Sequence, residues 1–338
     1  MSSTAGGERI LVTGATGFIG GCLARGLVDD GVRVRALVRP NTDPGRIPAG
    51  VEVATGDLTD PDTLAQTAEG CALVYHVAAI TGSRNASIRE REAVNVKGAA
   101  DMVAAAARAG ARRFVHVSTC GVYGSRNRFP ADEASPMRPD TPYRISKARA
   151  ERAVLETARR TGLPVVVARL ASIYGPGATK WLPLCRSIRR NRFRMIGDGR
   201  NPLHLGHVFD IVDGLRRCAE TPGIEGRCYN LGAAEPVAIG QLVATIERAL
   251  GVRTTRRPWP AFPFRVTRHV DLALSRHLGL KLRRLHSYDL FLGARWFEIA
   301  RARRELGYRP RVASAEGLTA MVGEFVENGS IDSREAAR

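Results

Sequence analysis

The chain contains little lysine for so basic a protein. Only four of its 51 basic residues are lysines, Lys97, Lys147, Lys180 and Lys281, although the formal net charge is +18. Such one-sided use of arginine is typical of the codon bias of a GC-rich genome. No lysine-rich tail and no basic motif interleaved with aromatic residues accompanies it, so we do not expect nucleic-acid binding.

Long apolar runs and cysteine motifs are also absent. No run approaches the roughly 18 residues of a membrane span, and Met1 to Glu8 lacks the charged and apolar regions of a signal peptide. The six cysteines are scattered without C-x-x-C spacing or histidine partners, so neither a zinc site nor a disulfide framework is predicted. We expect a protein of the reducing cytoplasm with no metal and no membrane span.

Strands and helices alternate through the first half of the chain. Of the 338 residues, 44% are hydrophobic and 25% are charged, as in an ordinary globular protein. Apolar strands are expected at residues 10–12, 32–38, 51–54, 72–79, 113–118 and 165–170. Helical patterns fill residues 18–28, 62–69, 91–109 and 143–161. This alternation is that of βαβ units, which form a parallel sheet covered on both faces.

A glycine-rich turn follows the first of these strands. Ile10 to Val12 run into the sequence TGATGFIG, with glycines at positions 14, 17 and 20, and a helix follows. Such glycines permit a tight turn, close approach to a pyrophosphate and close packing of helix on strand, with the helix N-terminus facing the phosphates. The pattern predicts a dinucleotide site; the alternative is a structural turn.

The predicted fold is therefore α/β, a Rossmann-type doubly wound parallel sheet with a smaller C-terminal substrate-binding lobe. Regular alternation weakens near residue 175. We assign residues 1–175 to the dinucleotide-binding domain, with returns near 204–214 and 227–234. Residues 176–338 mainly form the substrate lobe, with helices near 239–250 and 301–306. At this length, one large or two modest domains are expected.

Tyr143 and Lys147 are candidates for acid–base chemistry. They lie four residues apart in a helical pattern, so their side chains share one face. An ammonium beside a phenol favours the phenolate and lowers the phenol pKa towards the range of proton exchange with an alcohol or ketone. The alternative is that both residues lie on a solvated helix face. Because lysine is scarce in this chain, its use at position 147 indicates a site that an arginine side chain does not fill. Thr119, at the carboxyl end of a strand, can donate to the substrate oxygen or cap a loop.

The chain resembles the extended short-chain dehydrogenase/reductase family over nearly its whole length. Ordered motifs carry the resemblance: TGATGFIG at 13–20, GDL at 56–58, HVAA at 76–79, NVKG at 95–98, FVHVSTCGVYG at 114–124, YRISK at 143–147, RLASIYGPG at 169–177 and ARRELGYRP at 302–310. The resemblance includes both NAD-dependent epimerases and dehydratases and 3β-hydroxysteroid dehydrogenases.

The resemblance implies roles for particular residues. The catalytic set would be Thr119, Tyr143 and Lys147. The cofactor residues would be Gly14, Gly17, Phe18, Ile19, Gly20, Asp57, Leu58, Ala78, Ala79, Tyr143 and Lys147. Asp57 and Leu58 would border the adenine, and the loop after Arg169 would lie beside the nicotinamide. Asn95 would support the site through the backbone or a water, or simply pack a helix.

Cofactor preference depends on the end of the second strand. Relatives that prefer NAD often place an acid there for the ribose hydroxyls, whereas this chain has Val38-Arg39. Arg39, together with Arg35, can pair with a 2′-phosphate. We therefore favour NADP(H), with NAD(H) as the alternative.

Two departures bear on the substrate. Cys120 and Gly121 stand where dehydratases of the resembled family carry an Asp-Glu pair, which argues against dehydration. The elements that hold the phosphates of sugar nucleotides are also replaced, although arginines 186, 189, 190, 192 and 194 can hold a diphosphate or form a solvated face. The C-terminal half is more similar to the steroid dehydrogenase branch. Residues 253–295 mix arginines with Trp259, Phe262, Phe264 and Phe291. Three roles are open for these aromatic side chains: they line an apolar pocket, they rest against a membrane surface, or they pack in the core.

Three functions are weighed on this basis. The leading hypothesis is an NAD(P)-dependent oxidoreductase that transfers a hydride between the nicotinamide and a secondary alcohol or ketone, with Tyr143 as acid and base. The alternative is a sugar-nucleotide epimerase with tightly held NAD. A non-catalytic NAD(P)-binding protein is the third, and the intact set of Thr119, Tyr143 and Lys147 argues against it. The partner is a small-molecule substrate, and a homodimer is possible.

Overall fold

The computed structural model describes residues 8–82, 86–125, 127–264, 266–267 and 293–331. Phe291 and Lys281, which the sequence singles out, lie outside these ranges. Within them, no helix is long and apolar enough to cross a membrane. The same ranges contain no group of three or more His, Cys, Asp or Glu side chains that could hold a metal ion.

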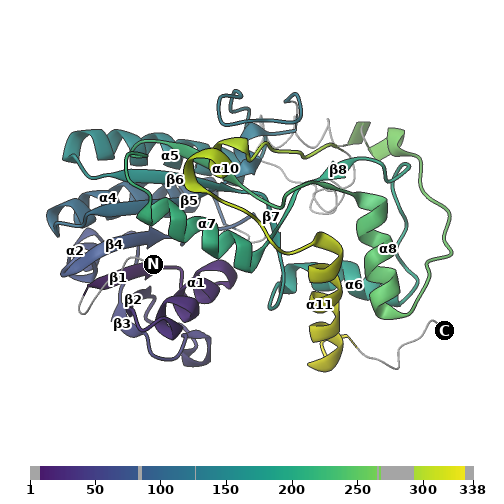
Figure 1. Ribbon diagram of the computed structural model, residues 1–338, viewed down its shortest axis with the longest axis horizontal. Coiled ribbons are helices and arrows are strands. Elements are labelled where there is room, and N and C mark those ends of the chain that lie inside the picture. Colours follow the sequence, from purple (N-terminus) through teal and green to yellow (C-terminus); the bar gives the residue numbers. More distant parts are fainter. Residues whose placement is uncertain (1–7, 83–85, 126, 265, 268–292, 332–338) are drawn as a thin grey trace.

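Seven parallel strands form the central sheet, in the order β10-β6-β5-β4-β1-β2-β3 (Figure 1). The order reverses at β1 and β4, which is where doubly wound sheets leave a crevice for a ligand. The strands are β1 (Arg9–Thr13), β2 (Arg33–Val38), β3 (Glu52–Thr55), β4 (Cys71–His76), β5 (Arg113–Thr119), β6 (Val165–Leu170) and β10 (Cys228–Leu231). The predicted α/β fold is confirmed.

Helices cover both faces of the sheet, which explains why its strands read as continuous apolar runs. Along β1, Ile10 and Val12 belong to the core on one face, and Leu11 belongs to the core on the other. The first face carries α1 (Phe18–Asp29) and α7 (Val208–Glu220). The second face carries α2 (Pro61–Ala68), α4 (Gly98–Arg108) and α5 (Pro142–Thr161).

A separate apolar core lies towards the opposite end of the molecule from α2 and α4 (Figure 1). Trp181, Leu242 and Met321 are among its buried members. Its helices are α6 (Leu182–Arg189), α8 (Ile239–Leu250) and α11 (Ser314–Glu327). Short strands accompany it: β7 (Ser172–Tyr174) pairs with β9 (Leu205–His207), and β8 (Pro202–Leu203) pairs with β11 (Val237–Ala238). We keep the division of the chain near residue 175 as a proposal.

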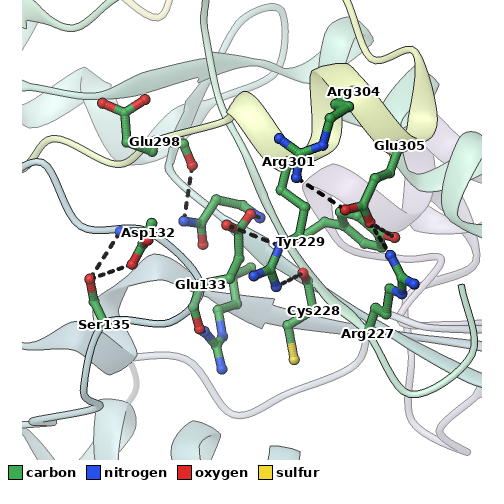
Figure 2. Close-up of polar contacts among 12 residues, drawn as sticks. Asp132, Glu133, Ser135, Arg227, Cys228, Tyr229, Glu298, Arg301, Arg304 and Glu305 are labelled. Atoms are coloured by element: carbon green, nitrogen blue, oxygen red, sulfur yellow. Dashed lines mark hydrogen bonds and ion pairs between the residues drawn. The ribbon is translucent and has the colours of Figure 1, made fainter.

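Polar contacts join α10 (Ala300–Leu306) to the last strand of the sheet (Figure 2). The carboxylate of Glu305 accepts hydrogen bonds from Nη1 of Arg227 at 2.7 Å and from the hydroxyl of Tyr229 at 2.8 Å. Both partners lie at the beginning of β10 or just before it. The C-terminal segment is therefore attached to the sheet that the N-terminal half of the chain builds.

Two predicted elements differ from those observed: one strand is shorter, and one helix is divided into three parts. The strand predicted for residues 72–79 stops at His76, because the next residues turn and the Ala78 amide donates to Oγ1 of Thr13 at 3.2 Å. The helix predicted for residues 91–109 is divided into α3 (Ile88–Arg91), the π-helical turn η2 (Glu92–Lys97) and α4. Such π turns occur frequently at functional sites.

Candidate active site

The glycine turn presses against the end of β4. Gly14 has φ of +75°, and a Cβ there would lie 2.8 Å from the Ala78 nitrogen. A Cβ at Gly20 would lie 2.2 Å from the Gly14 carbonyl oxygen. The Gly17 amide donates to that same oxygen at 2.9 Å. The structure thus brings the glycines together with Ala78, and contact of these residues with a cofactor stays a prediction.

The N-terminus of α1 fits a pyrophosphate. Gly17 is the N-cap residue, and no side chain caps the helix. No acidic residue stands in the first turn either. The amides of Phe18 and Ile19 begin the helix, and such first-turn N–H groups, with the positive end of the helix dipole, favour an anion. The Phe18 ring packs near Gly177, in the loop after β7.

We predict that Gly20→Ala will weaken cofactor binding by about tenfold or more, which corresponds to about 1.4 kcal/mol. The added methyl must displace the Gly14 carbonyl, so the turn moves from the phosphates. Isothermal titration with NADPH measures the loss. Gly323→Ala in α11 is the matched control, because it is also helical and its Cβ would meet nothing within 4 Å. Equal NADPH affinity in both variants would contradict the placement of the phosphates.

An exposed guanidinium stands just after the second strand of the sheet. Arg39 follows β2 and is exposed. Arg35 is engaged elsewhere, because it pairs with Glu52 at 2.8 Å and donates to the Glu69 carbonyl at 2.7 Å. The prediction that Arg35 assists Arg39 is therefore wrong. Arg46, which the sequence analysis missed, donates to the Thr16 carbonyl at 3.0 Å and lies beside the glycine turn.

Asp57 and Leu58 follow β3 in a short turn. The Asp57 carboxylate accepts hydrogen bonds from the Thr59 amide at 2.9 Å and from the Thr59 hydroxyl at 2.7 Å. Leu58 is buried. Its carbonyl would lie 2.7 Å from a Cβ at Gly98, so α4 packs closely against this turn. Contact of these two residues with an adenine stays a prediction.

Thr119 and Tyr143 lie at the N-termini of two neighbouring helical segments. Thr119 ends β5, and its Oγ1 accepts from the Gly121 amide at 3.1 Å as the cap of η3 (Cys120–Tyr123). The hydroxyl proton of Thr119 remains for another acceptor. Thr141 caps α5 by accepting from the Arg144 amide, which places Tyr143 in the first turn. Both suggested roles of Thr119, loop cap and donor, are compatible with this geometry.

The electrostatics of Tyr143 differ from the expectation. Burial raises the pKa of this phenol to about 12, and the cations that oppose the rise are Arg91 and then Arg144. The predicted lowering by Lys147 is wrong, because helical spacing fixes the face of a side chain and not its degree of burial. Tyr143 is consequently protonated at neutral pH. Arg91 was missed by sequence reasoning; it is buried on α3 and donates to the Thr81 carbonyl at 2.8 Å.

Lys147 follows Tyr143 by one helical turn on α5 and is buried. It is 2% exposed, and its Nζ lies 3.3 Å from Nε2 of His116 on β5. Burial lowers the pKa of Lys147 to about 8, while Glu151 acts to raise it. The alternative of a solvated helix face is excluded for this residue.

A buried ion pair lies one helical turn beyond Lys147. Glu151 pairs with Arg169 at 2.7 Å, and their side chains are 2% and 6% exposed. Glu151 also accepts a hydrogen bond from the hydroxyl of Ser118, the neighbour of Thr119. Arg169 donates to the Tyr123 hydroxyl at 3.0 Å. Burial lowers the pKa of Arg169, but Glu151 raises it by more. This pair fixes the ends of β5 and β6 against α5.

Asn95 acts through the backbone, one of the two roles considered for it. Its Oδ1 accepts from the Ile80 amide at 2.7 Å, and its Nδ2 donates to the Ile80 carbonyl at 3.1 Å and to Oγ of Ser146 at 2.9 Å. The π turn thereby ties the loop after β4 to α5, which carries Tyr143.

The remaining candidates make tertiary contacts of their own or are exposed. Arg186 donates to the Ser330 carbonyl and Arg189 to the Leu250 carbonyl, so both are engaged in tertiary contacts. Trp259 stacks on Phe264 with ring centroids 5.4 Å apart. Phe262 is 75% exposed, so core packing does not account for it.

Comparisons with known proteins identify the family of this chain. A family model, "NAD dependent epimerase/dehydratase family", matches residues 10–232. A ketoreductase of Stigmatella aurantiaca acting on 4-hydroxy-2-methyl-3-oxo-4-farnesyl-3,4-dihydroquinoline-1-oxide is 35% identical over 93% of this chain and 95% of its own length. The 3β-hydroxysteroid dehydrogenase/Δ5→4-isomerase of Mycobacterium tuberculosis is 30% identical over 94% of this chain and 90% of its own.

A solved structure is similar over the whole fold. The crystal structure of gox2253 matches this chain with a TM-score of 0.82 and a sequence identity of 29%. The match covers 96% of this chain and 100% of the other. The chain belongs to the NAD-dependent epimerase/dehydratase family, that is, the extended short-chain dehydrogenases/reductases, and it is an NAD(P)-dependent enzyme.

Proposed function

We propose that the enzyme is an NADP(H)-dependent ketoreductase, which interconverts a ketone and a secondary alcohol on an apolar substrate. The observation that carries the proposal is that Thr119 ends β5, while Tyr143 and Lys147 stand on α5, the helix that packs against that strand. The relatives named above support the apolar class, since one acts on a farnesylated dihydroquinoline oxide and the other on a steroid.

The protein groups act on the substrate oxygen. The bound nicotinamide supplies or accepts the hydride. Tyr143 gives its phenolic proton to the carbonyl oxygen as negative charge develops there, and the Thr119 hydroxyl donates a hydrogen bond to the same oxygen. Lys147 adds positive charge behind them. Tyr143 carries its proton at neutral pH, so it can serve as the acid in ketone reduction.

Oxidation of NADPH with a cyclic or polyketide-like ketone tests this function. We expect net consumption of NADPH and formation of the secondary alcohol. Interconversion of sugar nucleotides without net cofactor turnover would instead establish the epimerase alternative. Cofactor binding without turnover of any ketone or sugar nucleotide tested would support the non-catalytic alternative.

We predict that Arg39→Asp will shift the preference from NADPH towards NADH. Arg39 is proposed to pair with the 2′-phosphate, with Arg46 as a second cation beside the glycine turn. Loss of a charge-assisted hydrogen bond costs about 1.5–3 kcal/mol, so the ratio of NADPH to NADH affinity should fall by about tenfold to a hundredfold. Fluorescence titration with both cofactors measures the ratio.

Arg33→Asp is the control for the loss of charge. Arg33 is exposed at the opposite end of β2, so its substitution should change the ratio only slightly. An unchanged ratio in Arg39→Asp would reject the assignment of the 2′-phosphate. A homodimer and a cytoplasmic location stay predictions, which light scattering and cell fractionation test.

A further inference from the structure

The ammonium of Lys147 has a histidine as hydrogen-bond partner. Its Nζ lies 3.3 Å from Nε2 of His116, and both side chains are buried. His116 stands three residues before Thr119 on β5. Phe114, two residues earlier on the strand, packs in the core beneath α5. Because side chains alternate along a strand, His116 points to that same face.

The surroundings of His116 set its protonation state. His76 is its partner in the register of β4 and β5, and the two rings stack with centroids 5.6 Å apart. Burial lowers the pKa of His116 well below its usual value, and Lys147 and His76 act in the same direction. His116 is therefore neutral at neutral pH. Its Nε2 accepts from Lys147 when the ring proton is on Nδ1.

Few charges compete for Lys147. On α5, Tyr143 and Glu151 lie one turn to either side, and Glu151 is already paired with Arg169 of β6. His76 and His116 approach from the sheet. Arg91 of α3 acts on Tyr143. On the π turn, Glu92 pairs with Arg149 and Lys97 pairs with Asp101, both outside the core. A single hydrogen bond therefore has a large influence on the charge of Lys147.

We propose that neutral His116 is a positioning residue, which through Nε2 holds the Lys147 ammonium in place and keeps it charged while the enzyme works. The proposal rests on the proposed function, in which Lys147 supplies positive charge behind Tyr143. The charged ammonium of Lys147 donates this hydrogen bond to Nε2 of His116, so the bond stabilises the charged form of Lys147. Without the bond, Lys147 loses its proton at a lower pH. Activity that depends on the ammonium then declines at lower pH as well.

Lysine-selective ¹³C labelling of the full chain tests the proposal, because only four lysines give signals. The Lys147 signal is the one that Lys147→Met removes. His116→Leu deletes the acceptor, and we expect the titration midpoint of Lys147 to fall by about one to two pH units. His116→Gln keeps an amide oxygen as acceptor and should stay near the parent value. The alkaline decline of kcat/KM for reduction should move with the midpoint.

Equal midpoints in His116→Leu and the parent would overturn the proposal. If that variant does not fold, the ¹⁵N signals of His116 in the unsubstituted protein decide: a non-protonated Nε2 supports the proposal, and a protonated Nε2 overturns it. The lysine midpoints and the histidine ¹⁵N signals require no turnover. Failure of the proposed ketoreductase activity would appear separately, as absence of NADPH consumption by the parent.

Discussion

Tyr143→Phe is expected to lower kcat for ketone reduction by about 10²–10⁴-fold, the usual contribution of a general acid. The phenol is the proposed proton donor, and phenylalanine keeps its ring and its packing. NADPH affinity should remain nearly unchanged, because the glycine turn and Arg39 are intact. Single-turnover reduction at saturating NADPH, with a separate titration of cofactor binding, measures both effects.

Tyr229→Phe is the matched control for this substitution. Tyr229 is buried, and its hydroxyl donates to Glu305 at 2.8 Å, far along the chain from Tyr143 (Figure 2). Its loss should cost about 1 kcal/mol of stability without lowering kcat. A Tyr143→Phe enzyme with the kcat of the parent would remove Tyr143 from the reaction.

Glu151→Ala should destabilise the protein by about 3–5 kcal/mol, as expected when one partner of a buried ion pair is removed. The guanidinium of Arg169, 6% exposed, would lose its carboxylate, and the Ser118 hydroxyl would lose its acceptor. Denaturant unfolding, followed by circular dichroism, measures the change in the free energy of unfolding.

Glu156→Ala is the control on the same helix. Glu156 pairs with Arg159 at 2.5 Å, but the two side chains are 59% and 71% exposed. Exposed pairs contribute less than about 1 kcal/mol, so this substitution should be nearly neutral. Similar losses for Glu151→Ala and Glu156→Ala would mean that the buried pair does not hold β5 and β6 against α5.

The fold was predictable because its signals are local. The turn at Gly14, Gly17 and Gly20 and the apolar runs of the strands depend on residues close in sequence, and βαβ alternation restricts the topology to a parallel sheet. Helix α11 was not anticipated, since its apolar positions are buried against elements distant in the sequence, mainly α8 and also β7 and β9. The π turn depends on the amide of Asn95 meeting the loop at Ile80.

The site was predictable only in part, for the same reason. The spacing of Tyr143 and Lys147 predicts a common helix face. It does not reveal that His116 lies against Lys147, or that Arg91 is the first cation acting on Tyr143. Those neighbours come from other elements of the fold. Arg35 was misassigned because its closeness to Arg39 in the sequence does not reveal that it pairs with Glu52 on the neighbouring strand β3.

Transfer of deuterium from [4,4-²H₂]NADPH, which carries the label on both faces of the nicotinamide ring, tests the account most directly. The enzyme is incubated with the labelled cofactor and a ketone panel, and the product is examined by mass spectrometry and NMR. We expect deuterium on the new carbinol carbon, with one NADP⁺ formed for each alcohol. Alcohol or epimer formed without deuterium from the added cofactor, or without net NADP⁺, would contradict the proposed ketoreductase.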